Sequence, residues 1–461
     1  MEIGIDTALK LGADFVEARG ESINRLLINF ENDIIKDINR STLCGIGFTV
    51  IYKGARGYGF TTSQDSNSIK DAAESAFKQA RAATILSEIS SAPVDYTPKE
   101  YSGKKPNIMK HPKDFDIEYK IELAKKGIDE TLKENVVNLR AIYGELWGQK
   151  YFLNSEGLKR FWEPIMVGLF YLHVVRKNGN IGNSREQISA SMGLELFDTK
   201  KPENIAKTSL RGAHEAAKAK TLKSGKYPAV ADPDFAGVLA HESFGHLTEG
   251  DYVATKASIL AGRLGQKIGS EHANVMESGD PVNYGFWIPY DDEGVDTKTV
   301  QLLKDGVLVG YLHARSTAKI MNMEPTGNAR AINYRFPPIV RMRNTYFGGG
   351  DMSKEEVFEL IKEGVYAEGS GGGQVEDTGT FTFGANRAYW VKNGEIRYPL
   401  KGVVMRGHIL DFIKNIIGAS KEVFVKTSIL GGCGKGGQAP LPVGLGGPYL
   451  AVKEAIIGGG A

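Results

Sequence analysis

The segment from His241 to His246 places the tightest constraint on the local fold of this 461-residue chain. Asp232 and Pro233 predict that a helix starts shortly before it, because aspartate can cap free amide groups and proline suits the first helical position. The two histidines are five residues apart, and an ideal helix, at about 100° per residue, would leave their side chains roughly 140° apart. They can face one ion only if the helix loosens near Gly245 or absorbs the extra residue in a π-bulge.

The residue types in His241-Glu242-Ser243-Phe244-Gly245-His246 are those of a metal site. In the related pattern H-E-x-x-H, two histidines on one helical face bind zinc and the glutamate acts as general base. The wider spacing here does not by itself separate a metal site from two histidines that are satisfied in the core. A third ligand is therefore decisive, since catalytic zinc usually takes three protein ligands and leaves one position for water.

Cys433 is the first candidate for that third ligand. It stands in the glycine-rich segment Gly431–Gln438, where the backbone can approach closely, and Lys435 could lower the pKa of the thiol and favour the thiolate. The alternative is that Cys433 is a small buried apolar residue, as most free cysteines are, and we assign Cys44 to that class. The competing candidates for a third ligand are Glu249, Asp251, His272 and His408.

Composition narrows the class of partner and the compartment. Fifty-seven lysines and arginines against 55 acidic residues leave a formal charge of +2, and without a basic stripe this argues against direct binding of nucleic acid. No stretch approaches the ~20 apolar residues of a membrane span, and no secretory signal is recognisable. Two cysteines far apart in sequence exclude a disulfide framework and fit a reduced, cytoplasmic setting.

The order of elements predicts an α+β fold. Residues 1–92 form an N-terminal module of helices and strands. A proline-bearing connector leads to a central helix–strand module over 93–222, which we expect to pack with the first as one N-terminal domain. Residues 223–461 are predicted to form a mainly antiparallel β domain that carries the helix of His241. Three turn signals mark β-hairpins, at Asn178-Gly179, Asp305-Gly306 and Asn393-Gly394.

The second half resembles the TldD/PmbA family of proteases, and in particular its TldD branch. The resemblance is carried by a series of ordered motifs: His241–Asp251, Asp292–Val295, Lys304–Leu312, Thr326–Arg330, Arg341–Thr345, Gly372–Val375, Cys433–Gln438 and Pro442–Gly444. The chain departs from the family pattern at Arg343 and His408, which bears on the substrate pocket.

The resemblance implies a zinc-dependent metallopeptidase that hydrolyses amide bonds in unfolded or extended peptides. It identifies His241, His246 and Cys433 as the metal ligands and Glu242 as the catalytic carboxylate. It also implies a dimer, either of this chain with itself or with a PmbA-like partner (also called TldE), which lacks the metal residues. Zinc is the default ion for two histidines and a cysteine, and iron is the other candidate.

Two questions stay open at the level of sequence. The oxyanion needs a donor besides the metal, and the candidates for substrate binding are Arg330, Asn344 and His408, each of which has a structural hydrogen bond as its alternative role. The second question is whether the protein is instead a non-catalytic, metal-stabilised scaffold or regulatory binding protein. Glu242 distinguishes the two, because a structural site closes with a fourth protein ligand and needs no base.

Overall fold

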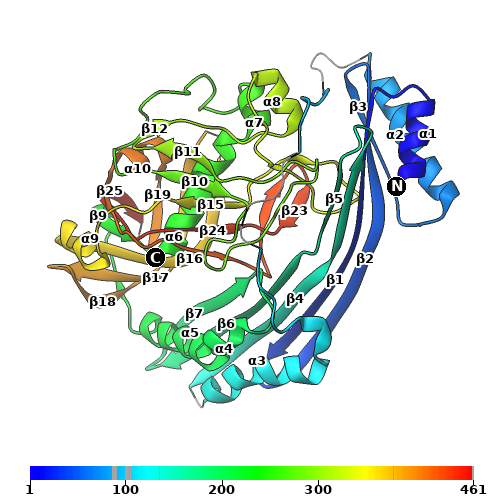
Figure 1. Ribbon diagram of the computed structural model, residues 1–461. Coiled ribbons are helices and arrows are strands. Elements are labelled where there is room, and N and C mark those ends of the chain that lie inside the picture. The colour runs from blue at the N-terminus through cyan, green and yellow to red at the C-terminus, as the bar shows by residue number, and fades with distance from the viewer. Residues whose placement is uncertain (86–90, 99–102, 104, 134, 377, 459–461) are drawn as a thin grey trace.

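The computed structural model describes residues 1–85, 91–98, 103, 105–133, 135–376 and 378–458. The first half of the chain forms a long curved sheet, and the second half forms a β-rich body against the inner face of that sheet (Figure 1). No helix among the described residues is long and apolar enough to cross a membrane.

The elements of the first half follow in chain order: α1 (Glu2–Lys10), β1 (Phe15–Glu31), β2 (Ile34–Tyr52), β3 (Ala55–Thr61), α2 (Ser66–Ala83), a 3-10 turn (Pro112–Asp114), α3 (Ile117–Thr131), β4 (Val136–Asn154), β5 (Lys159–Trp162), β6 (Ile165–Lys177), β7 (Asn180–Ala190), α4 (Leu196–Thr199) and α5 (Pro202–Ala216). Their strands pair antiparallel in the order β3-β2-β1-β4-β6-β7, with β5 on β4. The edge strand β7 matters most here, because it reaches the site described below.

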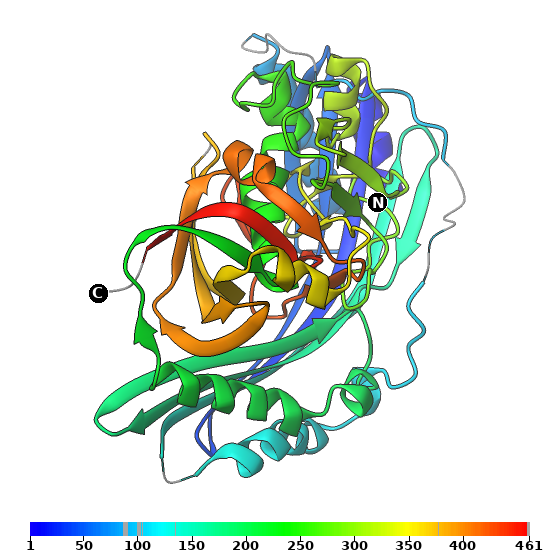
Figure 2. The same ribbon diagram turned by 90° about the vertical axis from the view of Figure 1, so that its left-hand side faces the viewer.

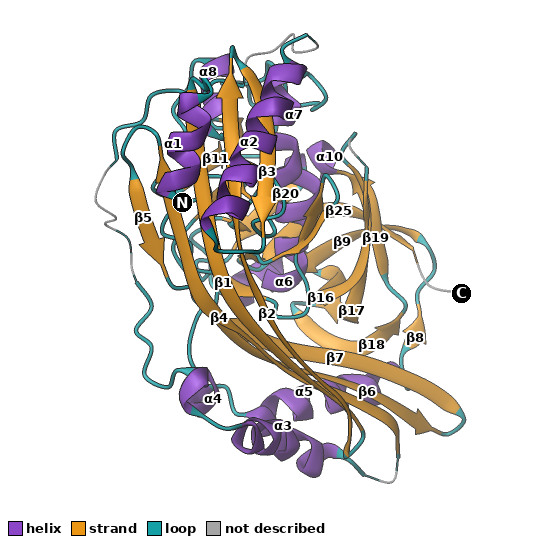
Figure 3. Cartoon of the chain, turned by 90° about the vertical axis from the view of Figure 1, so that its right-hand side faces the viewer, coloured by secondary structure: helices purple, strands orange, loops and turns teal. Residues whose placement is uncertain are grey.

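Strand β1 shows why the two faces of this sheet differ. Val16 packs with α1 and α2, and Ile28 packs with α3, so even-numbered residues face the helices. Ile23 faces the opposite way and packs against Phe286 of the second half. Because successive side chains of a strand point to opposite faces, helices cover one face of the sheet and the C-terminal body covers the other (Figure 3).

The elements of the second half are β8 (Lys220–Thr221), β9 (Gly225–Ala231), α6 (Pro233–Val238), a π-helix (Leu239–Gly245), a 3-10 turn (His246–Thr248), α7 (Gly250–Ala254), β10 (Val275–Ser278), β11 (Val300–Lys304), β12 (Val307–Leu308), α8 (Arg315–Met321), β13 (Ala329–Arg330), β14 (Ile339–Val340), β15 (Asn344–Phe347), α9 (Lys354–Leu360), β16 (Glu363–Val375), β17 (Thr380–Lys392), β18 (Glu395–Lys401), β19 (Val404–His408), α10 (Ile409–Lys414), β20 (Ile416–Ala419), β21 (Phe424–Thr427), β22 (Cys433–Lys435), β23 (Gln438–Leu441), β24 (Gly444–Gly447) and β25 (Leu450–Gly458).

Two large sheets and two two-stranded sheets, β13-β14 and β22-β23, build the described part of the C-terminal body. One large sheet runs in the order β12-β11-β10-β15-β24-β21, and in the other β16, β9, β25, β19 and β17 close into a ring because β16 also pairs with β17 (Figure 2). The main apolar core lies between the two large sheets and contains both Phe244 and Cys433. The α6 helix and the π-helix that follows it thus run through the most buried part of the domain.

The predicted α+β class with largely antiparallel sheets is confirmed. The three predicted hairpin turns are also confirmed, since Asn178, Asp305 and Asn393 and the glycine after each have positive φ values, as a type I′ turn requires. The proline-bearing connector, predicted from Ala92 to about Lys113, lies partly outside the described residues. Its described parts contain no α-helix or strand, and it ends in the 3-10 turn Pro112–Asp114.

Candidate metal centre

The helix that carries the first site residues starts as predicted. The Asp232 carboxylate accepts a hydrogen bond from the Phe235 amide at 2.8 Å, and Pro233 occupies the first turn. The chain then takes the π form over Leu239–Gly245 before a 3-10 turn begins at His246. A π turn absorbs one extra residue, so the histidines five apart come to one side, with ring centroids 5.4 Å apart.

Gly245 permits the close approach that this helix makes to its neighbour. A β-carbon at residue 245 would collide with the Sδ atom of Met342, whose side chain is fully buried. The glycine therefore serves a packing need here in addition to the helical distortion expected from the sequence.

Cys433 joins the two histidines from far along the chain. Its Sγ atom lies 3.4 Å from His246 Nε2, and one donor atom from each of His241, His246 and Cys433 lies within 4.8 Å of the other two. The four competing ligands are engaged elsewhere: Glu249 and Asp251 bind Lys435, His272 lies 4.0 Å from Glu271, and His408 caps α10. Among the described residues, this is the group of three or more such donors that could hold an ion.

The burial and hydrogen bonding of the His241 and His246 imidazoles suit the binding of a metal ion. His241 is fully buried, yet neither of its ring nitrogens has a hydrogen-bond partner, an arrangement that costs free energy unless another ligand satisfies it. His246 Nδ1 donates to Glu249 Oε2 at 2.9 Å, which leaves Nε2 for coordination. A carboxylate behind a ligating histidine fixes its tautomer and ring orientation. Two nitrogens and one sulfur are a donor set that zinc accepts.

The electrostatics of the site favour the thiolate form of Cys433. Burial alone raises the pKa of this thiol, but the nearby His241 and His246 outweigh it and lower the pKa to about 5. Burial lowers the pKa of His246, because it disfavours the charged imidazolium. Glu249 and Cys433 more than reverse that shift, so the pKa of His246 stands well above its ordinary value. Without metal, these shifts favour the charged forms of Cys433 and His246, and a metal ion would displace the proton of a ligating nitrogen.

The expectation that Lys435 favours the thiolate was wrong. Its ammonium group donates to both oxygens of Asp251 at 2.7 Å and to the Val340 carbonyl at 3.0 Å, and lies 3.0 Å from Glu249 Oε2. Lys435 thus forms ion pairs with Glu249 and Asp251. The thiolate of Cys433 is stabilised by His241 and His246. Lys435 links the Cys433 hairpin to Glu249 and Asp251, which follow His246 in the sequence; we call these contacts the Lys435 clamp.

Glu242 lies between two cavities that flank the three candidate ligands. One, of about 220 Å³, is also lined by His246, Tyr252 and Glu376. The other, of about 100 Å³, is also lined by His241, Cys433 and residues of β7 and β21. The Glu242 side chain is 35% exposed, whereas the His246 side chain is 17% exposed. The carboxylate is therefore accessible from both sides.

None of the three residues predicted to bind substrate lines either of these cavities. Arg330 is buried and donates to the carbonyls of Met342 and Pro442 at 2.5 and 2.7 Å. Asn344 is fully buried and bonds backbone groups of Ser278 and Phe286. The imidazole of His408 accepts from the Leu410 amide and bonds the Thr378 carbonyl. All three have structural hydrogen bonds.

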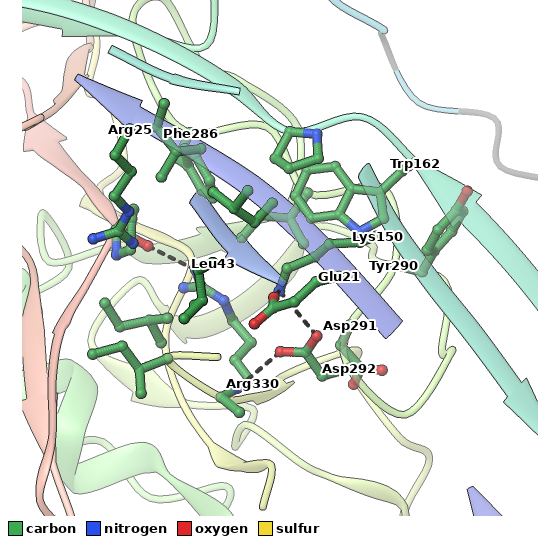
Figure 4. Close-up of a pocket in the computed structure, with 18 residues that line it drawn as sticks. Glu21, Arg25, Leu43, Lys150, Trp162, Phe286, Tyr290, Asp291, Asp292 and Arg330 are labelled. Atoms are coloured by element: carbon green, nitrogen blue, oxygen red, sulfur yellow. Dashed lines mark hydrogen bonds and ion pairs between the residues drawn. The ribbon is translucent and has the colours of Figure 1, made fainter. Parts of the chain in front are cut away.

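Arg330 also borders a separate cavity of about 50 Å³ between the curved sheet and the C-terminal body (Figure 4). Lys150 in this cavity is paired with Asp292 at 3.2 Å and with Glu21 at 3.5 Å, beside the aromatic side chains of Trp162 and Phe286. No member of the His241, His246 and Cys433 group lines it.

Sequence reasoning missed several residues around Glu242. Tyr252 and Glu376 border the larger cavity, and Gln187 and Lys426 border the smaller one. Tyr252 directly follows the quoted motif that ends at Asp251, and Glu376 directly follows the one that ends at Val375, so both were within reach. Gln187 comes from β7 of the first half, and only the packing of the two halves brings it here.

Comparison with known proteins gives a consistent result over the whole chain. Family models described as PmbA/TldA metallopeptidase domains match residues 16–80 (domain 1), 110–218 (central domain) and 224–459 (C-terminal domain). A metalloprotease of Methanocaldococcus jannaschii is 33% identical over 96% of each chain. A protein of Saccharolobus solfataricus named zinc metalloprotease TldD homolog is 29% identical over 99% of each chain.

Two solved structures share the fold. A Thermotoga maritima protein described as a putative modulator of a DNA gyrase has a TM-score of 0.81 at 22% identity, over 99% of each chain. TldE from Thermococcus kodakarensis has a TM-score of 0.81 at 21% identity, over 100% of each chain. At these identities the structures establish the architecture alone.

The contact at Gly245 predicts a coupled effect on stability. We expect Gly245→Ala to lower the free energy of unfolding by about 1–3 kcal/mol, because the added methyl group overpacks against Met342. Met342→Ala should cost about 2–5 kcal/mol on its own, and the double variant should lose less than the sum of the two, as urea unfolding can measure. Strictly additive losses would exclude the collision.

The thiolate predicts a pH titration in the metal-free protein. In a Cys44→Ser background, we expect the ultraviolet thiolate absorbance of Cys433 to persist at neutral pH and to disappear as the pH falls through about 5. The pKa is lowered, so the attraction between thiolate and imidazolium is present above this value and lost below it. The Cys433→Ser variant supplies the baseline, and a midpoint near the ordinary thiol pKa of about 8.5 would refute the assignment.

The Lys435 clamp predicts a loss of stability that depends on charge. Lys435→Met removes a cation from the fully buried Glu249, which keeps its contact with His246, and also removes the ion-pair partner of Asp251; removing one partner of a buried pair costs about 3–5 kcal/mol. Lys435→Arg keeps the charge and should lose much less. Urea unfolding of the metal-free variants measures the difference, and equal stability of Lys435→Met and wild type would show that the clamp contributes nothing.

Proposed function

The chain belongs to the PmbA/TldA metallopeptidase family, and from this premise we propose that it is a zinc peptidase of the TldD branch whose ion is held by His241, His246 and Cys433. The observation that carries the proposal is the buried, unpartnered imidazole of His241 beside a Cys433 thiol of lowered pKa. The naming of a relative as a zinc metalloprotease TldD homolog supports both the ion and the branch. Iron is the alternative ion for the same donors.

A bound metal ion would supply the Lewis-acid chemistry, and the protein would hold the ligands of that ion in place. When bound, a divalent ion at these ligands supplies Lewis-acid chemistry, which makes water more acidic and polarises a carbonyl group. The protein contributes the arrangement of the donors: Glu249 holds the ring of His246, and Arg341 holds the Cys433 hairpin by donating to the Cys433 carbonyl at 2.7 Å. Rigid ligands keep the ion in one place and one geometry.

Glu242 acts as the general base and then as the general acid. Its carboxylate lies 3.7 Å from His246 Nε2, next to the donors, and is open to both cavities. It accepts a proton from the attacking water and later passes it to the amine that leaves. An open carboxylate beside three donors favours this role over the alternative of a metal-stabilised scaffold or regulatory binding protein, which would close the site with a fourth protein ligand.

The substrate in this proposal is an unfolded or extended peptide. The cavities on the two sides of Glu242 give room for chain on both sides of a cleaved bond, and a folded segment would not fit cavities of this size. We propose a dimeric assembly, with a second copy or with a TldE-like partner, on the family resemblance and on the shared fold with TldE. The near-neutral charge speaks against direct binding of nucleic acid.

Substitutions of Glu242 and Cys433 distinguish a role in catalysis from a role in metal binding. We expect Glu242→Gln to keep one zinc per chain and to lower hydrolysis of an unfolded peptide by about 10²–10⁴-fold, the usual contribution of a positioned acid or base. Cys433→Ala should instead lose bound metal, as elemental mass spectrometry can measure. Glu395→Gln, on an exposed strand, is the matched control. Unchanged hydrolysis in Glu242→Gln would refute the role of Glu242 as the base. Unchanged metal content in Cys433→Ala would refute the role of Cys433 as a ligand.

A further inference from the structure

The larger of the two cavities beside Glu242, which we term the Glu376 pocket, has the features of a pocket for one substrate side chain. Its walls include Leu247, Tyr252, Ala257 and Val375, with Glu376 and Lys435 among its polar residues. It measures about 220 Å³ and adjoins both Glu242 and His246. This inference rests on the proposed function, because it assigns the chemistry that the same centre would select.

The positively charged residue of this pocket, Lys435, already has partners within the protein. Lys435 Nζ donates to both oxygens of Asp251 and to the Val340 carbonyl, lies 3.0 Å from Glu249, and stands 4.2 Å from the centre of the Tyr252 ring. An ammonium group has three protons to donate, so Lys435 has none left for a substrate carboxylate. Two acids, Glu249 and Asp251, surround this one lysine, so its charge is balanced within the protein.

Glu376 is the charged group that remains available. Its side chain is exposed, and its carboxylate accepts one long hydrogen bond, at 3.4 Å, from its neighbour Thr378. Among the residues that the structure describes, no lysine or arginine forms an ion pair with it. Glu376 and Glu242 are the two acidic residues that line this pocket.

The backbone holds Glu376 in place. Residue 376 follows the end of β16, and its amide donates to the Thr380 carbonyl at 2.8 Å while its carbonyl accepts from the Gly379 amide at 2.8 Å. His408 also supports this turn: its Nδ1 accepts from the Leu410 amide, so Nε2 carries the proton and donates to the Thr378 carbonyl at 2.9 Å. His408, predicted to bind substrate, thus positions the turn that carries Glu376.

We propose that the Glu376 pocket selects a substrate residue with an aliphatic stem and a cationic head, that is, lysine or arginine. The stem contacts Leu247, Ala257 and Val375, as long basic side chains do when they bury their methylene groups and keep the charge near water. The head pairs with the carboxylate of Glu376. Glu376 is therefore a specificity-determining residue for the peptidase, beside the residues that carry out the reaction.

The test uses the zinc-loaded full chain and peptides that are acetylated and amidated, so that no terminal charge is present. The peptides differ at one position, which holds lysine, its neutral near-isostere norleucine, or glutamate, and mass spectrometry locates the cleaved bond. Exposed ion pairs are weak, so we expect the lysine peptide to exceed the norleucine peptide about threefold in kcat/KM. Glu376→Gln should abolish this ratio, and Glu376→Lys should reverse the order to favour glutamate.

Glu363→Gln is the matched control, because Glu363 starts the same strand β16, is exposed, and lies 3.9 Å from Lys392. It should keep the wild-type ratio. Equal kcat/KM for lysine and norleucine, or a ratio that survives in Glu376→Gln, would overturn the proposal.

Hydrolysis and selectivity can fail independently. If the zinc-loaded wild type cleaves none of the peptides, the proposed function fails, and the same peptides are then compared by competition binding to the same protein. A preference for lysine that disappears in Glu376→Gln still supports the cationic pocket. Equal binding of all three peptides overturns it.

Discussion

The buried ammonium of Lys435 connects the two parts of the chain that make the metal centre. It belongs to the hairpin that begins at Cys433, and it binds Glu249 and Asp251, which follow the helix of the two histidines. Glu249 in turn orients His246. Since a buried carboxylate without a cation costs several kcal/mol, each part of this chain of contacts requires the next. The ligand from the end of the sequence is thereby held against the ligands from its middle.

The first half of the chain completes the surroundings of that centre. The Ser189 hydroxyl of β7 accepts a hydrogen bond from the Ile429 amide, and Gln187 of the same strand accepts one from the Ser428 hydroxyl. These contacts hold the segment that leads from β21 into Cys433. The curved sheet is therefore more than a support for the C-terminal body, because its edge strand forms one wall of a cavity that adjoins Glu242.

How far the sequence predicts this site depends on the range of each interaction. The spacing of His241 and His246 is local, and it correctly required a distorted helix, which the structure shows as a π turn. Cys433 is 187 residues from His246, and no local pattern relates the two; its glycine-rich segment made it one candidate among several, and the family resemblance selected it. Lys435 was misassigned because proximity in sequence to a thiol suggested a partner, whereas its Nζ atom points toward two carboxylates 184 and 186 residues earlier. Arg330 and Asn344 have polar groups suited to a substrate, but the carbonyls they bind become visible only in the folded chain.

X-ray absorption at the metal edge of the zinc-loaded chain tests the central claim most directly, because it reports which atoms surround the ion. The arrangement of His241, His246 and Cys433 predicts one sulfur at about 2.3 Å and two imidazole nitrogens at about 2.0–2.1 Å, with one further light atom from solvent. The sulfur contribution should vanish in Cys433→Ser. A spectrum of the wild type without sulfur, or one unchanged by that substitution, would contradict the proposed centre.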